Sequence, residues 1–270
     1  MRATPPPMHL ELVPLLRVER ELYETPRGFV RFRAYLKAMQ GGSDDVDLLP
    51  LVALNPMGKE HVAAVLDVLL ALDAEAVAAD AIASAARRLR GVAGSFKVGL
   101  VVSDDAQGGW TQRQLTDARQ RFELDAALKR GWITVLLWSS ETPSREAVRR
   151  QTLAAIYRAC YVLRHGEPRT LGQMLQQEGL AAAFAEQPPP GLAPDELAAI
   201  RAVIDPRRDE TAYPVLIAAL YGDAAARTVG YPPLGLPENA GFTLALHEAL
   251  QLGVAPEAAL LGDARRASSG

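Results

Sequence analysis

Apolar residues along this chain occur partly in short continuous runs and partly at helical spacing, and the two patterns alternate. Three short apolar runs, at residues 48–54, 98–102 and 132–138, predict buried strands, and each is followed by a polar loop. Pro50 favours the start or the edge of a sheet for the first run, because proline has no N–H group to donate. Residues 9–13 alternate between apolar and polar side chains, which is a weaker sign of an edge strand.

The stretches between these runs show the three-to-four-residue spacing of amphipathic helices. Thr25-Pro26 and Thr142-Pro143 each have the pattern of an N-cap followed by a first-turn proline, and Thr170 with Gln173 forms a capping-box pattern. The predicted helices cover residues 26–39, about 60–90 with a break near Leu72-Asp73, 112–129, 143–165, and several segments after residue 170.

The order of strand, helices, strand, helix, strand and helices predicts an α/β protein. We expect a small, mostly parallel sheet of about three or four strands, flanked by helices, with a helical C-terminal region. Residues 188–191, Pro-Pro-Pro-Gly, form the clearest linker. The expected division is therefore an α/β core domain over residues 8–186 and a helical region over residues 187–262, packed on or next to the core. In such a sheet the carboxyl ends of the strands share one edge, where α/β proteins bind ligands.

Composition narrows the classes of function. The 270-residue chain has a formal net charge of −3, so no overall positive field attracts it to nucleic acid or anionic lipid. The single cysteine, Cys160, excludes an intrachain disulfide framework and a multi-cysteine metal site, and it fits a reducing compartment. The N-terminus lacks the apolar run of a signal peptide, and acidic residues interrupt the most apolar helical stretch, residues 62–86. We therefore expect a cytoplasmic location and no membrane contact.

The richest chemistry follows the second predicted strand, in residues 104–113. Asp104 and Asp105 are two adjacent carboxylates directly after a buried strand, where they are costly to desolvate unless they are paired or bound to metal. They could hold a divalent cation such as Mg²⁺, or act as acid/base groups. Trp110, Thr111 and Arg113 complete the loop as candidate binding residues, with Arg113 offering a fork for an anion. The plain alternative is a tight turn with Trp110 in the core.

The loop after the first predicted strand, residues 55–61, carries a Gly-Lys pair at a predicted helix start. Lys59 and the backbone N–H groups there could hold an anion, with Asn55 beside them. This is not a P-loop, because Ala53 stands where that motif requires glycine and Glu60 follows the lysine. Among the histidines, His61 is the best candidate for a ligand or acid/base group. An ordinary loop with an acidic first helical turn is the alternative.

The third strand end carries Ser139-Ser140-Glu141-Thr142. Hydroxyl groups in this position usually cap the following helix. Glu141 could assist at a shared site only if the three strand ends lie side by side, as a parallel sheet requires.

Two resemblances to known families fail at specific positions. An apolar strand followed by two acids is similar to the phosphoribosyltransferase signature, but the small Thr/Gly run expected after the acids is missing. His247-Glu248 is similar to the start of the zinc-protease helix motif, but Gln251 replaces the second histidine. We therefore assign the chain to no family on its sequence.

The leading hypothesis is that the chain binds or acts on an anionic small molecule, bearing phosphate or carboxylate, at the carboxyl edge of the sheet. Whether it is an enzyme is left open. The candidate catalytic residues are Asp104, Asp105 and His61; the candidate binding residues are Asn55, Lys59, Trp110, Thr111, Arg113 and Glu141; and the candidate metal ligands are Asp104 and Asp105.

Two alternatives remain. The chain could be a non-catalytic interaction or regulatory protein, and a homo-oligomer, if the apolar segment 231–237 is exposed. It could also bind nucleic acid through the basic and aromatic side chains of residues 26–39, such as Arg27, Arg31, Arg33 and Lys37. The net negative charge makes nucleic acid the weaker alternative.

Overall fold

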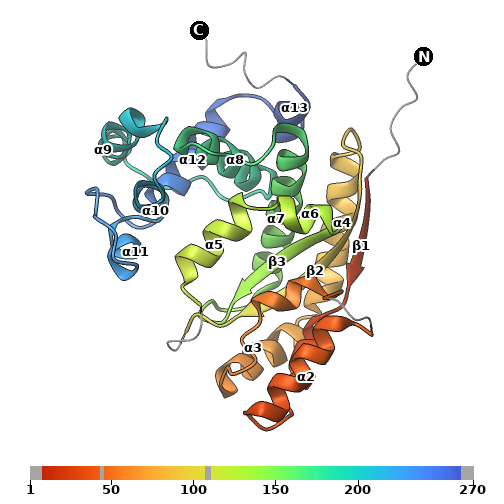
Figure 1. The fold of residues 1–270 in the computed structure, drawn as a ribbon. Helices are drawn as coiled ribbons and strands as arrows, with labels where there is room; N and C mark the ends of the chain where they lie inside the picture. Colours follow the sequence, from red (N-terminus) through yellow and green to blue (C-terminus); the bar gives the residue numbers. More distant parts are fainter. Residues whose placement is uncertain (1–7, 43–45, 107–110, 263–270) are drawn as a thin grey trace, which may run out of the picture. The chain divides into compact units, whose positions relative to one another are not determined.

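The computed structural model describes residues 8–42, 46–106 and 111–262 (Figure 1). The chain divides into two compact units. Unit 1 comprises Met1–Arg113 and Asp125–Ile156, and unit 2 comprises Gln114–Leu124 and Tyr157–Gly270. In this division, residues 157–186 group with the C-terminal helices.

Unit 1 is built on three parallel strands that lie side by side in the order β1-β2-β3 (Figure 1). The strands are β1 (His9–Val13), β2 (Ser95–Ser103) and β3 (Trp132–Trp138). The predicted α/β class with a small parallel sheet flanked by helices is therefore confirmed. Two of the three continuous apolar runs form strands, and the alternating run at residues 9–13 forms the edge strand β1.

The prediction of a strand at residues 48–54 is wrong. These residues form a short 3-10 helix, η1 (Leu49–Ala53), with Leu51 fully buried in the same apolar cluster as Val101 of the sheet. Gly99 permits this close packing, since a Cβ atom there would lie 3.0 Å from Cγ of Pro50. The run is apolar because it covers the sheet, and Pro50 suits a helical first turn better than a hydrogen-bonded strand.

The helices cover the predicted stretches with corrected ends, but the single helix predicted over residues 112–129 is wrong: these residues form two helices, α5 (Arg113–Phe122) and α6 (Asp125–Lys129). The predicted break near Leu72 is confirmed, and Asp73 adopts a left-handed conformation there (φ 51°). The predicted N-caps at Thr25 and Thr142 are wrong. Gly28 is the N-cap of α2. The helix after β3 begins at Arg145, and there the Ser144 hydroxyl accepts a hydrogen bond from the Ala147 N–H group (3.1 Å). The helices are α1 (Leu16–Leu22), α2 (Phe29–Gln40), α3 (Glu60–Ala71), α4 (Ala74–Arg88), α6 (Asp125–Lys129) and the first half of α7 (Arg145–His165).

All regular secondary structure in the described parts of unit 2 is helical. The predicted capping box of α8 is confirmed, because the Thr170 side chain accepts a hydrogen bond from the Gln173 N–H group (3.3 Å). The helices are α5 (Arg113–Phe122), which starts in unit 1, the second half of α7, α8 (Leu171–Phe184), α9 (Pro194–Ile204), η2 (Asp205–Arg207), α10 (Tyr213–Tyr221), α11 (Asp223–Thr228), α12 (Ala240–Gln251) and α13 (Pro256–Leu261).

The segment at residues 231–237 is less exposed than the interaction hypothesis assumes. Leu236 is buried, and Tyr231 and Leu234 pack on the apolar core of unit 2, while Pro232 and Pro233 are exposed. Asp223 holds this segment by accepting backbone hydrogen bonds from residues 234–236. Within the described parts of the chain, no helix combines the length and the apolar character needed to cross a bilayer.

Candidate functional site

A polar cluster surrounds Asp104 at the carboxyl end of β2. Asp104 is 3% exposed. Its Oδ1 atom lies 2.7 Å from Nε2 of His61 and 3.0 Å from the donating hydroxyl of Ser139, and its Oδ2 atom accepts from Nδ2 of Asn55 (3.2 Å). Burial acts to raise the pKa of Asp104, but the hydrogen bonds from His61 and Ser139 outweigh it and leave the pKa below its ordinary value. Asp104 is therefore an ionised, buried carboxylate.

His61 lies in the first turn of α3, and its imidazole is oriented by Asp104. Because the carboxylate can only accept, Nε2 carries the proton in this contact. The side chain is 20% exposed. Its second nitrogen, Nδ1, is buried and has no hydrogen-bond partner among the described residues. An imidazole held at one nitrogen, with the other nitrogen unpaired, is the arrangement expected of an acid/base group.

The loop at residues 55–61 reaches this edge of the sheet although no strand precedes it. Asn55 accepts a hydrogen bond from the Met57 N–H group at Oδ1 (3.0 Å), and its carbonyl accepts from the Tyr23 hydroxyl (2.7 Å). Gly58 is required for packing, since a Cβ atom there would lie 2.8 Å from the Tyr23 hydroxyl. Asn55 therefore positions Asp104, and the Gly58 position is explained by Tyr23 rather than by an anion.

Arg113 ties the second and third strand ends together. Its Nη1 atom donates to Oδ2 of Asp105 and to the Ser140 hydroxyl, both at 2.8 Å, and its Nη2 atom pairs with Glu141. The guanidinium lies 5.0 Å from the ring centroid of Trp138. Burial acts to lower the pKa of Arg113, but the charges of Glu141 and Asp105 raise it above its ordinary value. Arg113 is thus a permanent cation with one buried and one exposed carboxylate partner.

The remaining predicted site residues, Lys59, Thr111 and Trp110, form fewer contacts with the cluster or lie outside the described residues. Lys59 is exposed at the start of α3. The Thr111 hydroxyl lies 3.4 Å from the Ser103 hydroxyl. Trp110 lies outside the described residues. Sequence reasoning missed Tyr23, whose only signal was an aromatic residue in an ambiguous segment, and it treated Ser139 and Ser140 as caps rather than as donors to the two aspartates.

The carboxylates of Asp104 and Asp105 are already supplied with donors. Each of their four oxygens accepts at least one hydrogen bond, from His61, Asn55, Ser139, Ser140, Arg113 or the Ala106 N–H group. Within the described residues, no group of three or more His, Cys, Asp or Glu side chains could hold a metal ion. A cation would therefore have to displace existing donors and keep much of its water shell.

A buried carboxyl group lies on the same side of unit 1. Glu19 of α1 is fully buried, and its Oε2 atom accepts from the Val102 N–H group (3.0 Å), while Oε1 has no partner among the described residues. Burial raises the pKa of Glu19 well above its ordinary value, against a smaller lowering by the Val102 hydrogen bond. The pairing of β1 with β2 ends at Val13 and Gly99, so β1 offers no partner further along β2. Glu19 thus accepts the hydrogen bond of the Val102 N–H group there.

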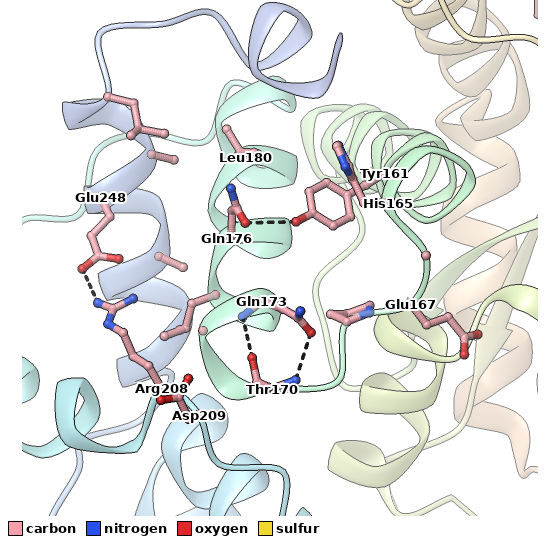
Figure 2. Close-up of a pocket in the computed structure, with 17 residues that line it drawn as sticks. Tyr161, His165, Glu167, Thr170, Gln173, Gln176, Leu180, Arg208, Asp209 and Glu248 are labelled. Carbon is pink, nitrogen blue, oxygen red and sulfur yellow. Dashed lines mark hydrogen bonds and ion pairs between the residues drawn. The ribbon is translucent and has the colours of Figure 1, made fainter. Parts of the chain in front are cut away.

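A separate cavity lies in unit 2, with a volume of about 590 Å³ (Figure 2). The side chains of Gln173 and Gln176 project from α8, and Gln176 accepts a hydrogen bond from the Tyr161 hydroxyl (3.2 Å). On the α12 side, Arg208 pairs with Glu248 (2.6 Å). The volume is sufficient for a small ligand. The cavity contains none of the sequence-predicted residues.

In comparisons with known proteins, no protein family, no curated protein and no solved structure matches this chain. The chemistry of the polar cluster is therefore judged from its own geometry.

Proposed function

We propose that unit 1 binds a small anionic molecule, bearing a carboxylate or phosphate, at the carboxyl edge of the sheet, and that His61 with Asp104 acts on it as an acid/base pair. The observation that carries the proposal is the His61 imidazole. Asp104 holds its Nε2 atom at 2.7 Å while its Nδ1 atom is buried without a partner among the described residues. A buried nitrogen without a hydrogen-bond partner is an exception that requires an explanation, and proton exchange with a bound ligand is the explanation proposed here.

Arg113 is the group proposed to bind the anion. Its contact with Asp105 is internal, since the Asp105 side chain is 3% exposed, whereas its partner Glu141 is 44% exposed. A solvent-exposed ion pair contributes only about 0–1 kcal/mol, so a ligand anion can replace Glu141 at little cost. Asp105 and Ser140 would keep the guanidinium in place during the exchange. Glu141 thus occupies the position that the ligand carboxylate or phosphate would take.

Isothermal titration calorimetry with inorganic phosphate, and separately with succinate, tests this assignment. The Arg113→Gln variant should lose binding by at least tenfold. The Glu141→Gln variant should bind both anions more tightly, because the competing carboxylate is gone. Glu11→Gln is the matched control, because Glu11 is an exposed glutamate of β1 and its loss changes the net charge equally. Arg113→Gln binding as well as the wild type would refute the proposal.

A divalent cation at Asp104 and Asp105 is a second proposal, supported by two adjacent carboxylates directly after β2. The wild type should broaden the signals of nearby protons when Mn²⁺ is added, and Asp104→Asn and Asp105→Asn should each weaken this effect at least tenfold. Equal broadening in all three proteins would remove this proposal and leave the anion site untouched.

A further inference from the structure

The outward face of α2 carries large apolar side chains in contact with solvent. Phe29 is 69% exposed, Val30 60% and Leu36 41%. The opposite face is buried, with Tyr35 and Met39 in the apolar core of unit 1. Large apolar side chains that gather on one face of a helix and contact water often mark a surface that another surface covers.

The same face is basic. With 100° between successive helical residues, Arg33 and Lys37 fall between Phe29 and Val30 on the helix circumference. The α2 sequence, Phe-Val-Arg-Phe-Arg-Ala-Tyr-Leu-Lys-Ala-Met-Gln, contains no acidic residue. Arg27, in the turn before α2, is also exposed. The face therefore carries apolar side chains and cations, and α2 itself contributes no acidic side chain to neutralise these cations.

The cations of this face have no carboxylate partner among the described residues. The guanidinium of Arg33 lies instead 4.8 Å from the ring centroid of Phe29. Among the described residues, two exposed acids that flank α2 in the sequence form ion pairs elsewhere: Glu24 with Arg20 (3.8 Å) and Asp47 with Lys97 (3.9 Å). The charge is thus available to an external anionic surface.

We propose that this face of α2 docks on an anionic lipid surface, with Phe29, Val30 and Leu36 in the headgroup boundary and Arg33 and Lys37 against lipid phosphates. A helix with an apolar face flanked by Lys and Arg lies in the plane of such a surface. The contact is peripheral and needs no membrane-spanning helix. It is independent of the function proposed for the polar cluster.

Lipid explains the face better than nucleic acid does. Single-stranded nucleic acid is held by aromatic platforms, and Phe29 is the only exposed aromatic side chain of α2, because Tyr35 is buried and Phe32 is partly buried. The aliphatic side chains Val30 and Leu36 find apolar surroundings at a bilayer boundary and none against phosphates. Charge complementarity alone would permit both partners, so the test separates them.

Co-sedimentation of the full chain with vesicles tests the proposal. Vesicles of phosphatidylcholine with phosphatidylserine should bind the protein at low salt, whereas vesicles of phosphatidylcholine alone should not. Each basic side chain near an anionic surface contributes about a fivefold change in affinity, so the Arg33→Gln/Lys37→Gln double variant should bind about 25-fold more weakly. Phe29→Ser should weaken binding by about tenfold.

The control is the Arg87→Gln/Arg90→Gln double variant, which removes two exposed cations from the α4 region of the same unit. It should bind like the wild type. The proposal is overturned if the wild type does not bind the anionic vesicles, or if both double variants lose binding equally. It is also overturned if an oligothymidylate, tested by fluorescence anisotropy, binds in a manner that depends on Arg33 and Lys37 while the vesicles do not bind.

Discussion

The His61 imidazole and the Asp104 carboxylate meet at 2.7 Å although 43 residues separate them in the chain. Asp104 directly follows β2, the central strand of the sheet, and His61 lies in the first turn of α3. Asn55 completes the contact from the same loop as His61. In the site of unit 1, the buried carboxylate of Asp104 therefore connects the end of β2 with the loop that begins α3.

Replacing Asp104 with Asn should destabilise the protein by about 1–3 kcal/mol at pH 7, because four donors then face an uncharged side chain. The folded-state pKa of Asp104 lies below its unfolded value of 3.8. Its contribution is therefore present above that value and is lost as the pH falls through the folded pKa. Urea unfolding should show a smaller difference between wild type and variant at pH 3 than at pH 7. The exposed Asp80→Asn variant should show no such change.

Glu19 should give stability the opposite dependence on pH. Its folded-state pKa is raised, so the folded protein holds this proton above pH 4.5 while the unfolded chain releases it. Stability should fall as the pH rises from 5 towards the folded pKa, by up to about 1.4 kcal/mol per pH unit. Glu19→Gln should abolish this fall. Glu21→Gln, an exposed change on the same helix, should leave it intact, and an unchanged slope in Glu19→Gln would contradict the assignment.

Glu178 of α8 is the centre of a buried ion network in unit 2. Its side chain accepts from Arg158 (2.7 Å) and pairs with Arg121, which also bonds to Asp117 (2.6 Å). Burial acts to raise the pKa of Glu178, but the two arginines lower it to about 2. Glu178→Gln should cost about 3–5 kcal/mol in thermal or urea unfolding, because it leaves buried arginine charge uncompensated. The exposed Glu238→Gln should change stability by less than about 0.5 kcal/mol.

Because the folded pKa of Glu178 is depressed, its stabilising effect is present above about pH 4.5 and is lost as the pH falls towards 2. The difference between the wild type and Glu178→Gln should narrow over that range. A constant difference from pH 7 to pH 3 would show that the network does not depend on the charge of Glu178.

Gly179 marks the closest approach of α8 and α12. A Cβ atom at this position would lie 2.2 Å from the carbonyl oxygen of Ala245. Gly179→Ala should therefore force the two helices apart and lower the free energy of unfolding by about 1–3 kcal/mol. Gly191→Ala is the matched control, because a Cβ atom there meets no atom within 4 Å. Equal stability of the two variants would show that the crossing tolerates a methyl group.

The tertiary structure explains why one apolar run was misassigned. Residues 48–54 and 132–138 are both continuous and apolar, so their periodicity does not distinguish a strand from a segment that covers a sheet. Pro50 argues against a central strand, because proline cannot donate a backbone hydrogen bond. Only the close approach of Pro50 to Gly99 shows that the run packs on the face of the sheet. The edge position belongs to residues 9–13, whose alternating pattern is the weaker local signal.

The sequence by itself determined the α/β class, the strands at β2 and β3, the helix break near Leu72 and the polar residues at the strand ends. These follow from local periodicity, from the cost of burying unpaired polar groups and from backbone preferences of single residues. Only the tertiary structure decided that His61 meets Asp104, that Arg113 is held between Asp105 and Glu141, and that the two units divide within α7. Those outcomes depend on side chains brought together by packing across long sequence separations, which no local pattern encodes.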